Sequence, residues 1–489
     1  MHSYLLWATP TLVVALAIAF LKWNATRAAL LGLALTVPIA FFTGPIPFSV
    51  DKLAESLLRG SWIGGTIAPY ILGGLLFWRV ASSKHALDDA DAPAAELDPH
   101  ARRRRLFFAC FLVGPFAESA TGFGVGMVGT VMMLRHLGLA PRHLMVFALL
   151  SQTFIPWGAM SSGTLLGATY LRVSPTDLAL YSSVPVATLM LLWLTLFWAT
   201  LRQANENISL AECGWELLWV AASLASLVAC TYLLGPETAL LAAFSPLIIV
   251  RYLVDERPNG QALRQRAIAC LPYGLIIGWL AATRLIAGLR EWLSTLVFFR
   301  PFPDLPMLLP LMHSGLWFLV AALLTAAFRK RTHTLKGEIV ASWSTGQQAV
   351  WTVFLFAMMA EMLNKSGIAQ GLAHGLFAAL GPDAMVLTPA LAGALGIIAN
   401  TGNAGNSLLL PPLSTLAAQA GISLLATGAV VHVSGLALGF FSPVRMSIAA
   451  KLSHGAAQER SVYLFLLPFA LAAFAVMTCF AWLSTMQTW

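Results

Sequence analysis

Apolar runs long enough to cross a lipid bilayer recur along this 489-residue chain. A run of about 18 or more apolar residues is typical of a transmembrane helix. Hydrophobic residues make up 58% of the chain and charged residues only 10%, whereas soluble proteins average about 25% charged residues. The sequence therefore predicts an all-α polytopic membrane protein with about 12 transmembrane helices. The expected spans are 4–21, 29–46, 62–80, 144–171, 178–200, 215–234, 238–254, 267–289, 306–328, 347–363, 423–442 and 461–485.

Two further apolar segments, 106–134 and 384–419, are interrupted by glycine-rich polar centres. Basic residues favour cytoplasmic loops, and no Lys or Arg precedes the first span, so both termini are predicted to lie outside. Counting spans forward, the arginines on either side of 106–134 both fall inside, whereas the cation-poor flanks of 384–419 fall outside. Each segment must then enter and leave the membrane on one side. We predict two re-entrant hairpins.

The hairpins divide a single transporter domain, 1–489, into halves of opposite orientation. The N-terminal half is 1–254 and the C-terminal half is 267–489. Inverted repeats with broken segments in corresponding positions are the best sequence-level pointer to a transport site. Segment 82–105 is predicted to be a flexible cytoplasmic linker. The expected location is the plasma membrane, the inner membrane of a bacterium.

The first hairpin carries Glu118, Ser119 and Thr121 beside Gly122 and Gly124. A charged side chain at the bilayer centre costs roughly 2.5–3.5 kcal/mol on insertion scales, so it indicates function by default. Glycines allow a close approach of the backbone to a ligand, and N–H groups at a half-helix N-terminus favour an anion. We predict proton coupling through Glu118 and substrate binding by the other four. The alternative is a helix-breaking turn in which Glu118 pairs with a neighbouring helix.

The second hairpin contains Asn400, Thr401, Asn403 and Asn406. Their amides and hydroxyl supply hydrogen-bond donors and acceptors without net charge, and we predict that they contact substrate. Capping of two half-helices by the same side chains is also expected and does not compete with a ligand role.

Each half also contains a span with a polar centre, one of them broken by Pro156. Arg445 could pair with a substrate carboxylate, and a snorkelling arginine is the alternative. His432 is a candidate proton carrier, and a structural histidine is the alternative. The predicted binding residues of these two spans are Gln152, Ser161, Ser162, Ser442 and Arg445.

The composition also argues against several classes of function. The net charge of +8 comes from cations in short loops, which determine topology, so no nucleic acid partner is expected. The five cysteines show no metal-ligand spacing, and no HExxH or DxD cluster occurs. We therefore expect no metal, no cofactor and no enzyme activity. A membrane-embedded transferase is the alternative from another class, and a channel is a third possibility.

Residues 118–124, Glu-Ser-Ala-Thr-Gly-Phe-Gly, resemble a loop of the lactate permease family, the proton-coupled carriers of lactate and glycolate. Asn364 with Ser366-Gly367, the polar loop ending at Asn406, and Ser442-Pro443 add to the resemblance. The resemblance implies proton symport of L-lactate, D-lactate or glycolate. It also implies two re-entrant hairpins in a domain that moves by an elevator-type mechanism, often in a homodimer.

The chain departs from the family pattern at two positions. Family members usually carry an Asp where this chain has Gly402, and a Lys where it has Gly439. Losing both residues preserves the charge balance, and Arg445 could supply the missing cation. The sequence therefore predicts a divergent carrier whose partners are a small organic anion, a proton and the lipid bilayer. A sodium-coupled carrier of another small organic anion is the alternative.

Overall fold

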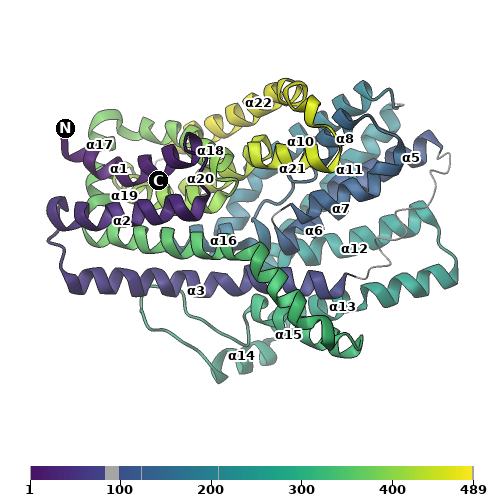
Figure 1. Cartoon of the computed structure of the whole chain (residues 1–489), viewed down its shortest axis with the longest axis horizontal. Helices are drawn as coiled ribbons and strands as arrows, with labels where there is room; N and C mark the ends of the chain where they lie inside the picture. Colours follow the sequence, from purple (N-terminus) through teal and green to yellow (C-terminus); the bar gives the residue numbers. More distant parts are fainter. Residues whose placement is uncertain (1, 83–97, 123, 207–208, 487–489) are drawn as a thin grey trace.

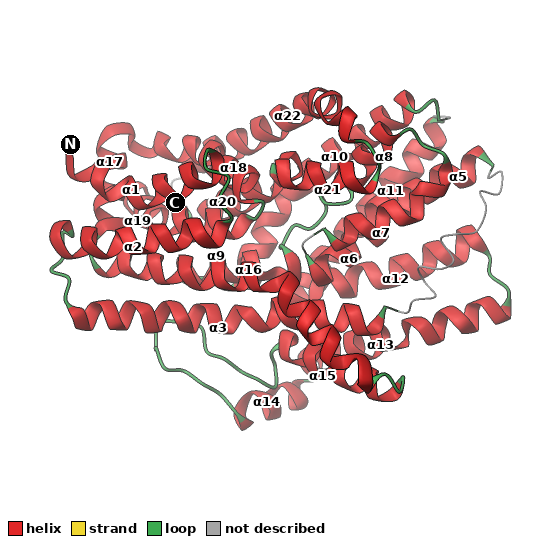
Figure 2. Cartoon of the chain, in the orientation of Figure 1, coloured by secondary structure: helices red, strands yellow, loops and turns green. Residues whose placement is uncertain are grey.

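A computed structural model describes residues 2–82, 98–122, 124–206 and 209–486, and these residues are almost entirely helical (Figure 1 and Figure 2). The first half contains α1 (His2–Ala19), α2 (Ala25–Thr43), α3 (Val50–Ala81), α5 (Pro99–Phe108), α6 (Gly114–Thr121), α7 (Val125–Leu134), α8 (Pro141–Leu150), α9 (Ser162–Leu171), α10 (Pro175–Gln203), α11 (Leu210–Leu234) and α12 (Pro236–Glu256). The second half contains α13 (Gly260–Leu285), α14 (Ala287–Leu296), α15 (Ser314–Phe328), α16 (Thr332–Lys365), α17 (Ile368–Leu380), α18 (Thr388–Ala399), α19 (Gly402–Ala420), α20 (Leu424–Ala437), α21 (Pro443–Leu452) and α22 (Glu459–Met486).

Within the described ranges, nine helical stretches are long and apolar enough to cross a membrane. They are Ala25–Thr43, Val50–Ala81, Pro175–Gln203, Leu210–Leu234, Pro236–Glu256, Gly260–Leu285, Ile368–Ala399, Leu424–Leu452 and Ala456–Met486. The prediction of an all-helical multi-pass membrane protein is confirmed. The finer prediction of 12 spans with two re-entrant hairpins stays a prediction. Two of the nine stretches contain more than one helix: Ile368–Ala399 joins α17 to α18, and Leu424–Leu452 joins α20 to α21.

The longest helices, α3 and α16, lie side by side and form a central pair (Figure 1). Helices approach closely in a membrane where small residues line the contact. A Cβ added to Gly60 of α3 would lie 2.4 Å from the backbone of Met358 in α16. A Cβ added to Gly73 would lie 2.2 Å from the carbonyl oxygen of Gly315, where α15 packs on α3. These glycines allow α3, α15 and α16 to pack closely together.

Helices α6 and α7 form one helical hairpin, and α18 and α19 form the other. The first tip turns at Gly122 and Gly124, whose φ angles of 70° and 83° favour glycine. A π-helical segment, Ala109–Val113, joins α5 to α6. The second tip turns at Asn400, with φ of 55°, a conformation that Asn tolerates. Both interruptions predicted by the sequence are therefore helix-turn-helix elements.

The two polar-centred spans are both broken. Between α8 and α9 the chain leaves the helix, and Met160 and Ser161 have φ angles of 46° and 57°. Between α20 and α21 a 3₁₀ turn, Gly439–Phe441, precedes the extended Ser442. Each break starts a new short helix in the middle of an apolar run. That helix begins with N–H groups that have no partner within it.

The predicted linker 82–105 ends earlier than expected, while its residues 83–97 lie outside the described residues. Pro99 begins α5, so the four arginines 102–105 are helical. Proline is well tolerated in the first turn of a helix. Arg103 is buried and its Nε lies 2.8 Å from a Glu216 oxygen in α11. Such pairing holds this arginine helix against the bundle.

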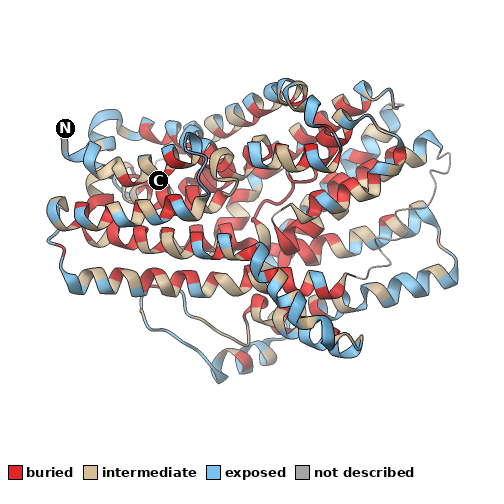
Figure 3. Cartoon of the chain, viewed as in Figure 1, coloured by how far each residue is buried: buried red, intermediate tan, exposed pale blue. Residues whose placement is uncertain are grey.

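Buried residues gather where the helices face one another around the hairpins and the broken spans (Figure 3). Large apolar side chains such as Phe42, Leu210 and Phe328 are exposed on the periphery. A lipid-facing surface needs no polar covering, so such exposure is expected in a bilayer. The polar breaks therefore lie inside the bundle.

Candidate functional site

A cavity of about 1060 Å³ is lined by both hairpin tips and both broken spans. Helices α10 and α16 and the turn between α1 and α2 complete its wall. Ligand sites favour such concave places, where a few polar groups converge among apolar ones. The elements that interrupt the apolar runs are thus brought to one place.

Four helices begin at this cavity. They are α7, α9, α19 and α21, and their first residues or caps line its wall: Gly124, Ser162, Gly402 and Pro443 respectively. A helix N-terminus carries roughly half a positive elementary charge and presents free N–H groups. The C-terminal ends of α6, α18 and α20, at Gly122, Ala399 and Ala437, line the same wall, so the helix dipoles largely offset one another. The breaks therefore offer N–H donors to a ligand rather than a net positive potential.

Glu118 lies at this cavity and is buried. Its two carboxylate oxygens accept hydrogen bonds from the backbone N–H groups of Gly124 and Gly126, each at 2.9 Å. With the Gln152 amide oriented to satisfy both of its ends, Gln152 donates to Glu118 Oε1 at 3.1 Å and accepts from Met127 N at 3.1 Å. Glu118 therefore caps α7. It occupies the backbone N–H groups that the sequence predicted to be available to a substrate.

Arg445, in the first turn of α21, is the cation nearest to these groups. Its Nε donates to Asn400 Oδ1 at 2.9 Å, and Nη1 lies 3.5 Å from the Gln152 carbonyl oxygen. Among the described residues no carboxylate oxygen lies within 4.0 Å of a nitrogen of Arg445, the limit for a salt bridge. The hydrogen-bond partners of the guanidinium are thus neutral, and Glu118 attracts it only from beyond salt-bridge distance, which leaves it able to accept an anion.

The two positions at which the chain departs from the family pattern both lie near this site. Gly402 lines the cavity, and Gly439 lies beside Arg445. A Cβ built on Gly439 would lie 3.6 Å from Arg445 Cζ, so the guanidinium occupies the space beside the missing lysine. A Cβ on Gly402 would lie 3.1 Å from Leu436 Cδ2, so Leu436 fills the space beside the missing aspartate. This geometry supports the hypothesis that Arg445 replaces the lysine.

The sequence model of the L-lactate permease family matches residues 3–302, more than half of the chain. The chain belongs to the L-lactate permease family. It is a membrane transporter and not an enzyme. The match contains Glu118 and the first hairpin, and both Gly402 and Gly439 lie beyond it.

A solved structure supports the fold. The YdaH transporter of Alcanivorax borkumensis, described as having an unusual topology, matches with a TM-score of 0.51 at 14% sequence identity. The alignment covers 95% of this chain and 99% of that one. No curated protein matches the sequence significantly. At this identity the likeness concerns the fold alone.

The structure brings most of the predicted site residues of this permease to the cavity wall. Ser162 and Asn403 have side chains that form no hydrogen bond with the described residues, so both are free for a ligand. The Thr401 hydroxyl accepts from Asn403 N at 3.2 Å and caps α19. The predicted residues that line the cavity are Glu118, Gly122, Gly124, Gln152, Ser162, Asn400, Thr401, Asn403 and Arg445.

Four predicted hydroxyls do not line the cavity, because backbone groups engage them. Ser119 donates to Phe116 O and Thr121 to Ala117 O, both at 2.7 Å within α6. Ser161 donates to Pro236 O, and Ser442 accepts from Val444 N at 3.3 Å. These groups build the breaks and turn away from the cavity.

His432 and Asn406 lie behind the wall and join three elements. His432 Nε2 lies 3.0 Å from Thr164 Oγ1 and 3.1 Å from Pro156 O. The Asn406 amide nitrogen donates to Gly163 O at 2.8 Å and lies 3.1 Å from His432 Nδ1. A neutral imidazole satisfies these contacts with Nε2 as donor and Nδ1 as acceptor. These hydrogen bonds link α20 and the second hairpin to the broken span that contains α8 and α9.

Sequence reasoning missed two cations of the cavity wall, Lys22 and Lys451. Both were interpreted as topology determinants, because a lysine beside a span gives no other signal. Gln348 and Thr352 of α16 also line the wall, and nothing in a single apolar helix indicated that they would face the site.

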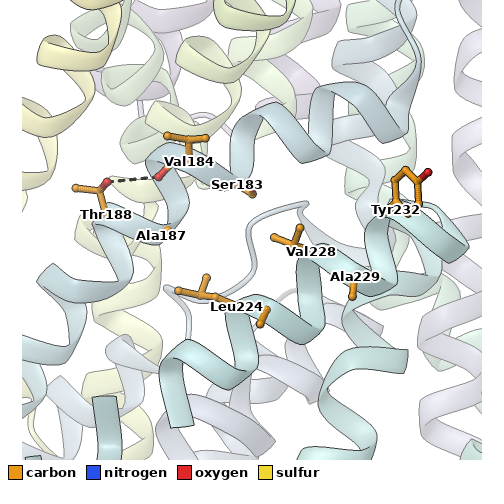
Figure 4. Close-up of a pocket in the computed structure, with 9 residues that line it drawn as sticks. Ser183, Val184, Ala187, Thr188, Leu224, Val228, Ala229 and Tyr232 are labelled. Carbon is orange, nitrogen blue, oxygen red and sulfur yellow. Dashed lines mark hydrogen bonds between the residues drawn. The ribbon is translucent and has the colours of Figure 1, made fainter. Parts of the chain in front are cut away.

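A second hollow, of about 900 Å³, lies between α10 and α11 (Figure 4). Its wall is apolar except for a few hydroxyls, among them Ser183 and Thr188. Ser183 donates to Leu180 O at 2.6 Å and Thr188 to Val184 O at 3.4 Å, both within α10. None of the described residues that line this hollow is charged. It offers nothing that would hold an anion or a proton.

Proposed function

We propose that this permease imports a small organic monocarboxylate, namely L-lactate, D-lactate or glycolate, by proton symport. The observation that carries the proposal is the convergence of Arg445 and the N-termini of α9, α19 and α21 on one cavity, whose described wall contains a single carboxylate, Glu118. Anions are stabilised by helix N-termini, and a guanidinium matches the geometry of a carboxylate. Ser162 and Asn403 are the free polar groups for the substrate hydroxyl.

Proton coupling follows from the place of Glu118. A substrate carboxylate at Arg445 would share the cavity with the carboxylate of Glu118. Two like charges in a poorly solvated site disfavour each other. A proton on Glu118 relieves this repulsion, so we assign the proton to Glu118. His432 is the less suited carrier, because both of its ring nitrogens are engaged in the network behind the wall.

We also propose an elevator-type movement. The second hairpin and the broken spans pack on one another through contacts of α9 with α19 and of α20 with α18 and α19, and the first hairpin packs through α7 on α8 and α21. Helices α3, α15 and α16 form a second group around their close glycine contacts, and the two groups meet where α3 contacts α6 and α9 and where α16 contacts α19. The hairpin group would slide along these contacts and carry the cavity with it.

Uptake into proteoliposomes tests the proposal. We expect an inside-alkaline pH gradient to drive accumulation of lactate or glycolate, and Glu118→Gln to abolish this drive while retaining substrate exchange without a gradient. Exchange retained by Glu118→Gln also shows that the variant is folded. Full gradient-driven uptake by Glu118→Gln would refute the proton role and leave the carrier intact. Accumulation that follows a sodium gradient instead would establish the sodium-coupled alternative.

A further inference from the structure

The cavity contains more positive charge than the binding of one substrate carboxylate at Arg445 needs. The ionisable residues of its wall are Glu118, Arg445, Lys22 and Lys451. Among the described residues of the wall Glu118 is the one acid, and its carboxylate already faces two backbone N–H groups. The two lysines are therefore not neutralised by any acid of the wall.

Lys22 and Lys451 come from opposite halves of the chain. Lys22 lies in the turn between α1 and α2, with a left-handed φ of 55°, and Lys451 lies in the last turn of α21. Both residues are exposed, and neither ammonium group has a hydrogen bond or ion pair with the described residues. By contrast, Lys365 is paired with Glu55 at 2.6 Å.

Lys451 lies on the same helix as Arg445. The two residues are six positions apart, which corresponds to a rise of about 9 Å along the helix axis. Arg445 is half-buried in the first turn, whereas Lys451 and Lys22 are exposed. The two lysines therefore belong to the solvent-accessible part of the cavity wall.

We propose that Lys22 and Lys451 form an outer anion-binding station at the cavity mouth, which passes the substrate carboxylate between Arg445 and the solution on that side. The proposal rests on the proposed transport of a small organic anion. A cleft lined by one sign of charge raises the local concentration of the opposite ion. Because both ammonium groups are solvated, the attraction is weakened by salt.

The first test measures transport by the full-length protein in proteoliposomes. We expect the double variant Lys22→Gln/Lys451→Gln to raise the apparent KM by roughly three- to tenfold at low salt, for lactate or glycolate supplied on the side to which the cavity opens. Vmax should change little, and the dependence of KM on ionic strength should flatten. The double arginine variant should resemble the wild type. Lys336→Gln, which removes the same charge from an exposed lysine outside the cavity, is the control.

A second test does not depend on transport. Trp23 lines the cavity mouth and is 38% exposed. Its emission, isolated by comparison with Trp23→Phe, should be quenched by iodide more strongly in the wild type than in the lysine double variant. Quenching by neutral acrylamide should be equal in both proteins, because acrylamide does not respond to the charge.

The outcomes separate the two proposals. Unchanged KM, unchanged salt dependence and equal iodide quenching in the double variant would overturn the outer station. If the wild type transports neither lactate nor glycolate while iodide quenching still depends on the two lysines, the anion station stands and the assigned substrate is wrong.

Discussion

Two arginines occupy the interior of this permease in opposite ways. Arg59 of α3 is buried and fully paired: its Nε lies 2.6 Å from Glu361, and its two terminal nitrogens lie 2.9 and 2.6 Å from the oxygens of Asp304. Asp304 in turn accepts from Arg172, at the end of α9, at 2.9 Å. Arg445 has one amide and one carbonyl as partners.

The difference separates a structural cation from the cation to which we assign the substrate. Around Arg59 three cations and three carboxylates balance, once Lys365 and Glu55 are included. A buried charge without a partner is costly, so a complete set of partners indicates that nothing else binds there. Around Arg445 the set is incomplete, because the one acid of the described cavity wall, Glu118, is bonded to backbone N–H groups instead. We expect an external anion to complete the second site and to disturb the first.

The largest effect should follow the removal of Arg59. Arg59→Met leaves Glu361 buried without its cation, which should destabilise the fold by about 3–5 kcal/mol. Thermal unfolding in detergent should show a much lower Tm. Arg445→Gln is the matched control and should keep a Tm close to that of the wild type. Equal losses of Tm in the two variants would remove the distinction between the two regions.

Next in size is the effect of Arg445→Gln on transport. Loss of a charge-assisted hydrogen bond costs about 1.5–3 kcal/mol, so uptake should fall by roughly 10- to 100-fold. Arg445→Lys should recover part of the activity, since it restores the charge without the planar fork. Initial rates of uptake in proteoliposomes check this expectation. If Arg445→Gln takes up substrate at the wild-type rate, the substrate anion binds elsewhere.

A smaller effect is expected for Asp304, which is half-exposed. Its hydrogen bonds with Arg59 lower its pKa to about 2. Because the folded-state pKa is depressed, the carboxylate stabilises the fold above its ordinary pKa near 3.8 and loses this contribution as the pH falls toward 2. Asp304→Asn should lower stability by about 1 kcal/mol or less at neutral pH.

The pH dependence gives the sharper readout for Asp304. Unfolding temperatures measured from pH 5 down to pH 3 should fall less steeply for Asp304→Asn than for the wild type. Parallel curves for the two proteins would contradict an ionised Asp304 bridging α3 and the end of α9.

The smallest effects should come from Ser119→Ala and Thr121→Ala. Both hydroxyls bond to carbonyl oxygens of their own helix, α6, and neither lines the cavity. Each variant should change stability by less than about 1 kcal/mol and leave the apparent KM for substrate unchanged. A Ser162→Ala variant, from the cavity wall, is the matched comparison and should raise KM. A raised KM in Ser119→Ala would place substrate on α6 rather than at the cavity.

Apolar run length predicted the helical membrane fold and most helices, because that signal depends only on local composition. The breaks at Pro156 and at Gly122 to Gly124 were also predicted, since proline and glycine limit the local backbone. The pairing of Arg59 with Asp304 was not predicted, because 245 residues separate them in the chain. The same holds for Lys22, which only the folded chain places at the cavity.

The sequence by itself predicted a membrane transporter with polar breaks in two halves, and it marked Glu118 and Arg445 as candidate functional charges. The reason is that an ionisable group in an apolar run is costly and marks itself. Only the tertiary structure decided which polar groups are free. Ser119, Thr121, Ser161 and Ser442 bond to nearby or distant backbone, while Ser162 and Asn403 keep open positions. Hydrogen-bond partners are assigned by packing between distant segments, and sequence spacing does not encode that packing.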